Sequence, residues 1–202
     1  MNAFVPAAIA AVVAFFVGAI PFGVLVSRAF YHTDLRAQGS GNIGAANALR
    51  TLGKRGAAAV LVLDALKGYA PALAAGAVGG TLPAALAAFA AVLGHCYSPF
   101  LGGKGGKGVA TFFGTLFALW WPAAAGFAIV WLAAVTASGY SSVGSMLGAL
   151  SSAAVLWYGL GRVGLLYGLV SAALVIYKHR ENIARLRAGT ENRLSLLKAR
   201  RS

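Results

Sequence analysis

Two glycine-rich polar segments interrupt an otherwise apolar chain: GSGNIGAAN at residues 39–47 and GGKGGKG at residues 102–108. We call them the first and the second glycine segment. Glycine lets successive backbone N–H groups turn toward one point and lets an anion approach the chain closely. Lys104 and Lys107 add positive charge to the second segment. Both segments are therefore typical of a site that binds phosphate groups.

The second glycine segment is not a nucleotide-binding P-loop, because that motif ends in Lys followed by Ser or Thr, whereas Lys107 is followed by Gly108. What remains is a concave run of backbone N–H groups formed by several glycines, with Lys104 and Lys107 as point charges. A helix that begins at Val109 would add its N-terminal dipole. The alternative is a flexible loop whose lysines only set the orientation in a membrane.

The first glycine segment carries hydroxyl and amide groups and is followed by an arginine. The groups that could meet an anion are Ser40, Asn42, Asn47 and Arg50, with Gly39 and Gly41 between or beside them. The planar guanidinium of Arg50 can hold two phosphate oxygens at once. The alternative is a glycine turn into a helix that begins near Ala45, with Ser40 or Asn42 as its cap.

A C-terminal polar segment, KHRENIARLRAGTEN at residues 178–192, follows the last apolar stretch. His179 and Asn182 are three residues apart and therefore share a helix face. Glu191 comes after a break at Gly189. Alone, His179 could equally be an anchor at the membrane surface.

Asp64 and Lys67 lie three residues apart inside an apolar stretch. A charge within a membrane is costly unless it is paired. The spacing predicts an ion pair between them that closes the helix bundle and supports the floor of the site.

The composition is that of an integral membrane protein, so membrane-spanning helices must position these polar groups. Of 202 residues, 59% are hydrophobic and only 10% are charged, and the mean hydropathy is +0.77. We expect an all-α, polytopic integral membrane bundle with a single domain over residues 1–202. About seven transmembrane helices are expected, and five is the alternative because several stretches are short. The predicted spans are roughly 4–26, 56–79, 82–98, 108–120, 123–138, 142–159 and 163–178.

The positions of Lys and Arg predict the orientation of the bundle, because cytoplasmic loops carry an excess of both. Basic residues gather in 27–55, 95–108 and 178–202, whereas Arg162 alone falls on the opposite side. A cleaved signal peptide is not expected, since no positive region precedes the first span. We expect an N-terminus outside, a cytoplasmic C-terminus, and both glycine segments and the C-terminal basic segment on the cytoplasmic face.

The remaining composition excludes several other classes of protein. The net charge of +13 lies beside the spans, so it reflects orientation and anionic lipid rather than nucleic acid. His95 and Cys96 are adjacent and point in different directions on a helix, which argues against a Cys–His nucleophile. The few His and acidic residues lack metal-ligand spacing, so we expect no metal and no cofactor.

The motifs in their order resemble the bacterial membrane glycerol-3-phosphate acyltransferase family, PlsY, over nearly the whole chain. They are GSGNIGAAN-x-x-R, D-x-x-K-G, GH-x-x-SPFLGGKGGKGVAT, YSS and HRENIARL-x-x-GTEN. The resemblance implies transfer of a fatty acyl group from acyl phosphate to the 1-hydroxyl of glycerol 3-phosphate. The products would be 1-acylglycerol 3-phosphate (lysophosphatidic acid) and phosphate, in the first acylation of phospholipid synthesis. The resemblance also implies a multi-pass protein of the bacterial cytoplasmic (inner) membrane with its active site facing the cytoplasm.

The resemblance also implies roles for individual residues. The implied catalytic residues are Ser40, Arg50, Lys104, His179 and Asn182. The implied substrate-binding residues are Gly39, Gly41, Asn42, Asn47, Gly105, Gly106, Lys107, Gly108, Ser141 and Ser142, and those of structural support are Asp64, Lys67 and Glu191. The second glycine segment would bind glycerol 3-phosphate. Ala46 and Gly103 depart from the Thr and Phe usual in the family, which implies a less rigid site.

Acyl phosphate carries its own leaving group, so direct transfer is favoured over an acyl-serine intermediate at Ser40. His179 is the strongest candidate for a general base, with the donor phosphate as the alternative proton acceptor. The expected partners are acyl phosphate, glycerol 3-phosphate and membrane lipids. A transporter of a phosphorylated or anionic metabolite is the alternative function, although it would place its charged groups near the middle of the bilayer.

Overall fold

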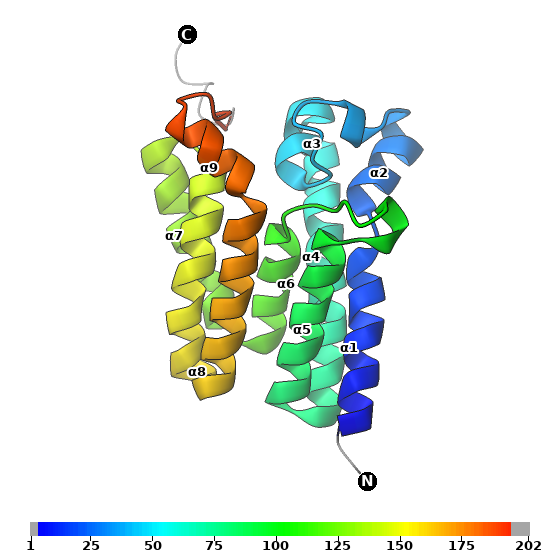
Figure 1. Cartoon of the computed structure of the whole chain (residues 1–202), viewed down its shortest axis with the longest axis vertical. Coiled ribbons are helices and arrows are strands. Elements are labelled where there is room, and N and C mark those ends of the chain that lie inside the picture. Colours follow the sequence, from blue (N-terminus) through cyan, green and yellow to red (C-terminus); the bar gives the residue numbers. More distant parts are fainter. Residues whose placement is uncertain (1–3, 195–202) are drawn as a thin grey trace. The chain divides into compact units, whose positions relative to one another are not determined.

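The computed structural model describes residues 4–194, and every regular element among them is helical, as the composition predicts. The elements, labelled in part in Figure 1, are α1 (Phe4–Ala19), α2 (Phe22–Tyr31), η1 (Leu35–Ala37), α3 (Ala45–Thr51), α4 (Gly53–Gly79), α5 (Thr81–Cys96), η2 (Pro99–Leu101), α6 (Val109–Leu119), α7 (Trp121–Ser138), α8 (Ser141–Lys178) and α9 (Arg180–Arg187). The chain forms two compact units that meet in sequence at Trp121 and Pro122. The single domain expected over residues 1–202 stays a prediction.

Five helical segments among the described residues are long and apolar enough to cross a membrane. They are Val5–Tyr31, Gly53–Gly79, Thr81–Leu101, Trp121–Ser138 and Ser141–Lys178, and the apolar helix Val109–Leu119 is shorter. At about 1.5 Å per residue, α6 is roughly 16 Å long, about half the thickness of the hydrocarbon core. The structure therefore shows a multi-pass helical protein, and the number of crossings depends on how α6 and α8 are counted.

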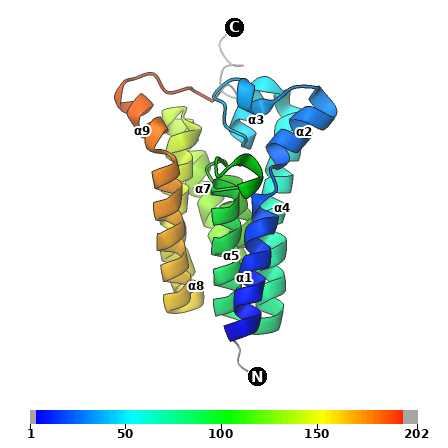
Figure 2. The same ribbon diagram turned by 45° about the vertical axis from the view of Figure 1, so that its right-hand side comes forward.

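Helix α8 reverses its direction at Gly161. This residue has φ 60° and ψ −143°, a conformation that only glycine adopts readily and that does not continue a helix. Figures 1 and 2 both show the yellow half of α8 running one way and the orange half returning beside it. The 38 residues of α8 are thus a helical hairpin rather than one long rod.

In the first unit, a break at Pro21 separates α1 from α2. Proline has no N–H to donate, so backbone carbonyls near the break lose their helical partners. Ser98 Oγ donates a hydrogen bond to the carbonyl of Ala19 at 2.6 Å, and Lys67 Nζ donates to that of Ile20 at 2.7 Å. Side chains from α4 and from the segment after α5 therefore hold the break in place.

The helices of the first unit approach one another closely at glycines. A Cβ atom on Gly18 would lie 2.1 Å from the carbonyl oxygen of Ala91, and one on Gly94 would lie 2.0 Å from that of Phe15. Gly68 and Gly114 make the same kind of contact between α4 and α6. In a bilayer, where helices gain little from hydrophobic burial against each other, such close packing is a principal source of association.

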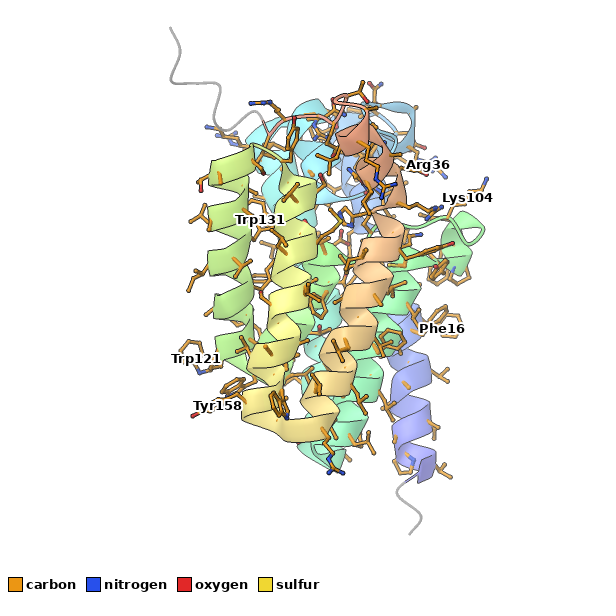
Figure 3. All side chains as sticks on the ribbon, turned by 60° about the vertical axis from the view of Figure 1, so that its left-hand side comes forward. Phe16, Arg36, Lys104, Trp121, Trp131 and Tyr158 are labelled. Atoms are coloured by element: carbon orange, nitrogen blue, oxygen red, sulfur yellow. The ribbon has the colours of Figure 1, made fainter. Side chains whose placement is uncertain are left out.

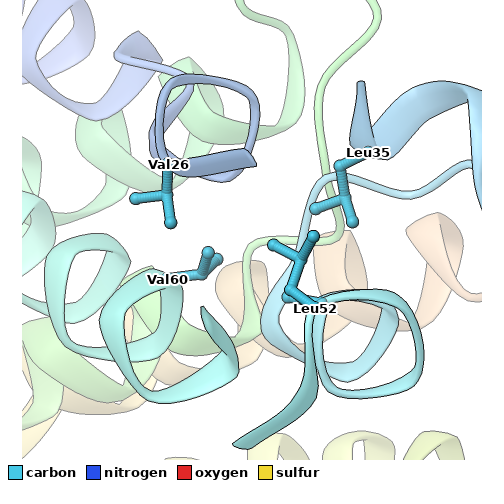
Figure 4. Packing of buried hydrophobic residues seen from close by; sticks show 5 residues of the cluster. Val26, Leu35, Leu52 and Val60 are labelled. Carbon is cyan, nitrogen blue, oxygen red and sulfur yellow. The ribbon is translucent and has the colours of Figure 1, made fainter. Parts of the chain in front are cut away.

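A small apolar cluster supports the first glycine segment. Side chains from α2, η1, α3 and α4 meet there, and the buried members are Val26, Leu35, Ala48, Leu52 and Val60 (Figure 4). The chain before and after the segment is thereby fixed to the bundle.

In the second unit, α7 and the two halves of α8 also pack through glycines. A Cβ on Gly144 would lie 2.8 Å from the carbonyl oxygen of Trp131, and one on Gly168 would lie 2.6 Å from Cα of Ala153. The outer faces of both units carry exposed apolar side chains, among which Phe16 and Tyr158 point away from the helices (Figure 3). Such faces suit contact with lipid.

Candidate active site

The side chain of Asn47 organises the first glycine segment. Its Nδ2 donates hydrogen bonds to the carbonyls of Leu35, Gln38 and Asn42 at 2.9–3.1 Å, and its Oδ1 accepts the N–H of Ser40 at 2.9 Å. Asn47 is buried. Because these bonds use all the polar atoms of the amide, we infer that Asn47 shapes the segment rather than contacting a substrate directly.

The remaining polar groups of the segment divide into two kinds. Asn42 Oδ1 accepts the N–H of Gly44 at 3.0 Å, so this amide also serves the turn into α3, which begins at Ala45. Ser40 and Arg50 are exposed, and the guanidinium of Arg50 makes no ion pair or hydrogen bond within residues 4–194. Ser40 and Arg50 are thus the two exposed side chains among these four polar groups.

Asp34, which the sequence did not single out, holds two arginines beside this segment. Its carboxylate accepts hydrogen bonds from Arg36 and from Arg28, each at 2.7 Å, and caps η1 through the N–H of Arg36. These hydrogen bonds, those from the Arg36 side chain most of all, hold the pKa of Asp34 well below its ordinary value of 3.8. Arg28 and Arg36 therefore carry less uncompensated charge than Arg50.

The second glycine segment folds over the end of α5 (Figure 2). The N–H of Gly105 donates to the carbonyl of Cys96 at 3.3 Å, and the N–H of Gly106 donates to that of His95 at 3.1 Å. The last four carbonyls of a helix have no partner inside the helix, and this segment supplies a donor to two of them, those of His95 and Cys96. The N–H groups of Gly105 and Gly106 thus have acceptors within the protein, and their expected role in binding a phosphate stays a prediction.

Gly105 and Gly106 also have no room for a side chain. A Cβ on Gly105 would lie 2.0 Å from the carbonyl oxygen of His95, and one on Gly106 would lie 2.2 Å from His95 Nε2. The sequence explains these glycines by the approach of a phosphate, whereas the structure explains them by the approach of α5. An alanine at either position is thus expected to displace the segment itself.

Two groups that could bind an anion flank Gly105 and Gly106, which we call the glycine pair. They are Lys104 before the pair and the start of α6 after it. Lys104 is exposed, and Figure 3 shows it extending away from the ribbon. Helix α6 begins at Val109, as predicted, after Gly108 with φ 80° and without a side-chain cap. The first N–H groups of α6 have no acceptor within the helix, which makes this end the favourable place for a phosphate oxygen.

The predicted ion pair between Asp64 and Lys67 is present, with 2.7 Å between Lys67 Nζ and Asp64 Oδ1. Both side chains are buried. His95 Nδ1 lies 3.7 Å from the same carboxylate oxygen. No role for His95 was predictable from sequence beyond its position beside Cys96, because only the fold brings α5 and α4 together here.

In the second unit, His179 lies buried at the junction of α8 and α9. Its Nδ1 is 2.7 Å from the carbonyl oxygen of Val175. Since a carbonyl can only accept a hydrogen bond, Nδ1 carries the proton and the lone pair of the neutral ring is on Nε2. This hydrogen bond therefore favours the neutral tautomer in which Nε2 is the basic nitrogen.

Glu191 binds the C-terminal polar segment together. Its carboxylate accepts hydrogen bonds from Asn182 Nδ2 at 2.5 Å, Ser142 Oγ at 2.8 Å and Arg185 Nε at 2.7 Å. Burial alone would raise the pKa of Glu191, but these three hydrogen bonds outweigh it and lower the pKa below 4.5. The expected break at Gly189 is present, with φ 70°.

Two residues expected to bind substrate lie beside this cluster. Ser142 donates its hydroxyl to Glu191 and Ser141 begins α8, and the substrate-binding role of both stays a prediction. Arg185 joins the cluster although the sequence did not mark it. No three His, Cys, Asp or Glu side chains in the described part of the chain are grouped as metal ligands.

Replacement of Glu191 by Gln is expected to destabilise the protein in a pH-dependent way. The ionised carboxylate favours the folded state, because its native pKa is below the ordinary value of 4.5. Its contribution, on the order of 2 kcal/mol for hydrogen bonds to a charged group, is fully present above pH 4.5 and is lost as the pH falls through the native pKa. Thermal unfolding in detergent should show a gap between wild type and Glu191→Gln at pH 7 that closes in acid.

The matched control is Glu181→Gln, because Glu181 lies exposed on α9. It should leave the unfolding temperature nearly unchanged at every pH. A pH-independent gap for Glu191→Gln would contradict the role of the ionised carboxylate.

The helical fold and its long apolar helices define a multi-pass α-helical membrane protein. The family model described as "Glycerol-3-phosphate acyltransferase" matches residues 8–189. A glycerol-3-phosphate acyltransferase of Rhodopseudomonas palustris (strain BisB5) is 45% identical over 185 residues, which cover 92% of this chain and 94% of that protein. One of Bradyrhizobium sp. (strain BTAi1 / ATCC BAA-1182) is 44% identical, with 98% of both chains covered.

A solved structure is also similar over nearly its whole length. It is the crystal structure of PlsY (YgiH), an integral membrane glycerol 3-phosphate acyltransferase, in its glycerol 3-phosphate form, with 39% identity, a TM-score of 0.90, and 97% of this chain and 99% of that chain covered. The lysophosphatidic acid form is similar with a TM-score of 0.86. The chain therefore belongs to the glycerol-3-phosphate acyltransferase family, and it is an acyltransferase.

Proposed function

We propose that the protein transfers a fatty acyl group from acyl phosphate to the 1-hydroxyl of glycerol 3-phosphate. The observation that carries this proposal is the similarity, over 97% of the chain, to a structure in its glycerol 3-phosphate form, together with the lysophosphatidic acid form of the same protein. The products are 1-acylglycerol 3-phosphate and inorganic phosphate. The reaction would be the first acylation of phospholipid synthesis.

In the proposed reaction, the hydroxyl oxygen of glycerol 3-phosphate attacks the acyl carbon of the donor. The bond from that carbon to the phosphate oxygen breaks, and phosphate leaves with the bonding electrons. Because both substrates are anions, the protein must hold them against their mutual repulsion and stabilise the oxyanion of the tetrahedral intermediate. The exposed cations Arg50 and Lys104 support this task in the first unit.

The proton of the attacking hydroxyl must also be removed. We assign this role to His179, because its hydrogen bond to Val175 leaves the lone pair on Nε2. Ser40 is a hydrogen-bonding group for substrate rather than a nucleophile, since no His, Asp or Glu hydrogen bonds with its hydroxyl among the described residues. Direct transfer then follows, without an acyl-enzyme.

The proposed topology has seven crossings, with the N-terminus outside and the C-terminus cytoplasmic. The reversal of α8 at Gly161 supports two crossings for its two halves, and α6 would be a short crossing. Residues 195–202 of the basic C-terminal region lie outside the described residues.

In a Cys96→Ala background, Lys54→Cys should react with an impermeant thiol reagent only from the cytoplasmic side and Arg162→Cys only from the outer side. Labelling of both from one side would contradict the topology.

The function is tested by mixing the purified protein in detergent with acyl phosphate and glycerol 3-phosphate. We expect stoichiometric formation of 1-acylglycerol 3-phosphate and inorganic phosphate. If no acylated product forms, while the protein in liposomes exchanges labelled glycerol 3-phosphate across the membrane, the protein is a transporter instead.

Substitution of Arg50 by Lys is expected to lower kcat/KM at least about tenfold, equivalent to about 1.4 kcal/mol. Lys retains the positive charge but loses the planar fork that holds two oxygens of a phosphate. The matched control is Arg162→Lys, since Arg162 is also exposed but lies at the opposite end of the α8 hairpin from the C-terminal polar segment. Equal effects of the two substitutions on kcat/KM in folded protein would contradict the assignment of Arg50 to the active site.

A further inference from the structure

His95 forms the surface on which the second glycine segment rests. It is only 3% exposed, at the end of α5. Its carbonyl accepts the N–H of Gly106 at 3.1 Å, and its Nε2 lies where a side chain of Gly106 would begin, 2.2 Å from an ideal Cβ. The imidazole ring and the backbone of His95 thus both contact the glycine pair.

Behind His95 lies the buried ion pair of Asp64 and Lys67. His95 Nδ1 is 3.7 Å from Asp64 Oδ1, and Lys67 Nζ is 2.7 Å from the same oxygen. Lys67 also donates to the carbonyl of Ile20 at the break between α1 and α2. His95, Asp64 and Lys67 therefore link the second glycine segment to α5, to α4 and to the break between α1 and α2.

The ion pair of Asp64 and Lys67 costs free energy within a membrane bundle, because both charged side chains must be desolvated there. An apolar side chain in place of His95 would cover the glycine pair with less desolvation. None of the acyl-transfer steps proposed above uses His95, Asp64 or Lys67. The presence of these three buried polar side chains therefore requires an explanation beyond packing alone.

We infer that His95 is a positioning residue for glycerol 3-phosphate, acting through the second glycine segment and fixed in turn by Asp64. This inference rests on the proposed role of that segment in binding glycerol 3-phosphate. Lys107, Gly108 and the start of α6 follow directly after Gly106, so the position of the glycine pair decides where these groups lie. A segment that is already ordered loses less conformational entropy when the anion binds.

His95 touches neither substrate, so its loss should weaken the binding of one substrate rather than slow the chemical step. We expect His95→Ala to raise KM for glycerol 3-phosphate about tenfold. The value of kcat and the KM for acyl phosphate should each stay within about threefold of wild type. His95→Gln, whose amide nitrogen can take the position of Nε2, should restore most of the loss.

The matched control for His95→Ala is Leu93→Ala, because Leu93 is half-buried on the same helix. It should leave KM for glycerol 3-phosphate unchanged. If His95→Ala does not fold, the comparison of His95→Gln with wild type carries the test, and a tenfold higher KM in that variant would contradict the rescue.

A pair of double variants tests the contact itself. The methyl group of Gly106→Ala would meet the imidazole of His95, so His95→Ala should make room for it. The methyl group of Gly105→Ala would meet the carbonyl oxygen of His95, which every residue has. We expect His95→Ala to relieve the defect of Gly106→Ala and not that of Gly105→Ala, which is a non-additive effect confined to one pair.

An unchanged KM for glycerol 3-phosphate in active His95→Ala protein would overturn the inference, and so would additive effects in both double variants. The proposed function fails by a different result, the absence of acylated product from wild-type protein. In that case the binding of glycerol 3-phosphate to wild type and His95→Ala, measured by calorimetry, still decides whether His95 positions an anion-binding segment.

Discussion

Replacement of His179 by Asn is expected to lower kcat about 100-fold or more, the usual contribution of a general base. The amide nitrogen of Asn can still donate to the carbonyl of Val175, as Nδ1 of His179 does at 2.7 Å. The substitution therefore removes the basic Nε2 while it retains the bond that fixes the junction of α8 and α9. KM for both substrates should change little, and the measurement is steady-state kinetics with each substrate varied.

The matched control is His32→Asn. His32 is exposed and has φ 50°, a left-handed conformation that Asn also tolerates. It should keep wild-type kcat. A loss of less than about tenfold for His179→Asn would mean that the donor phosphate, rather than His179, takes the proton.

Substitution of Asn47 by Asp is the second change with a large expected effect. It would place a carboxylate against the carbonyl oxygens of Leu35, Gln38 and Asn42, which now accept hydrogen bonds from Nδ2. A buried charge without a partner costs about 3 kcal/mol or more. We expect a clear fall in the thermal stability of the substrate-free protein and a loss of about 100-fold in kcat/KM.

The stability measurement distinguishes the two roles considered for Asn47. If Asn47 only contacted a substrate, as its place in the motif implies, the substrate-free protein would keep its unfolding temperature. Asn192→Asp is the control for the same chemical change at an exposed position. Equal unfolding temperatures for wild type and Asn47→Asp would restore the substrate-binding role.

Residue types and their spacing determined the class of this protein. With 59% hydrophobic residues and 10% charged residues, the chain requires a bilayer, and the helical architecture follows because backbone groups in lipid must bond internally. The ion pair of Asp64 and Lys67 was predictable for a similar reason, since its two members lie one helical turn apart. The break at Gly189 and the start of α6 at Val109 were also local signals.

The tertiary structure alone decided which polar groups are used within the fold. The bond from Lys67 to Ile20 spans 47 residues, that from Ser142 to Glu191 spans 49, and that from Ser98 to Ala19 spans 79. A sequence shows that such groups need partners but not which partner the packing brings within 3 Å.

The glycine pair illustrates the same limit most clearly. Gly105 and Gly106 indicate that something comes close to the backbone, and a phosphate is the natural expectation from sequence. The structure identifies the neighbour as His95, because the last carbonyls of α5 need donors and the N–H groups of the pair supply them. Local chemistry thus determined that these positions must be glycine, and only the packing of α5 against the segment determined why.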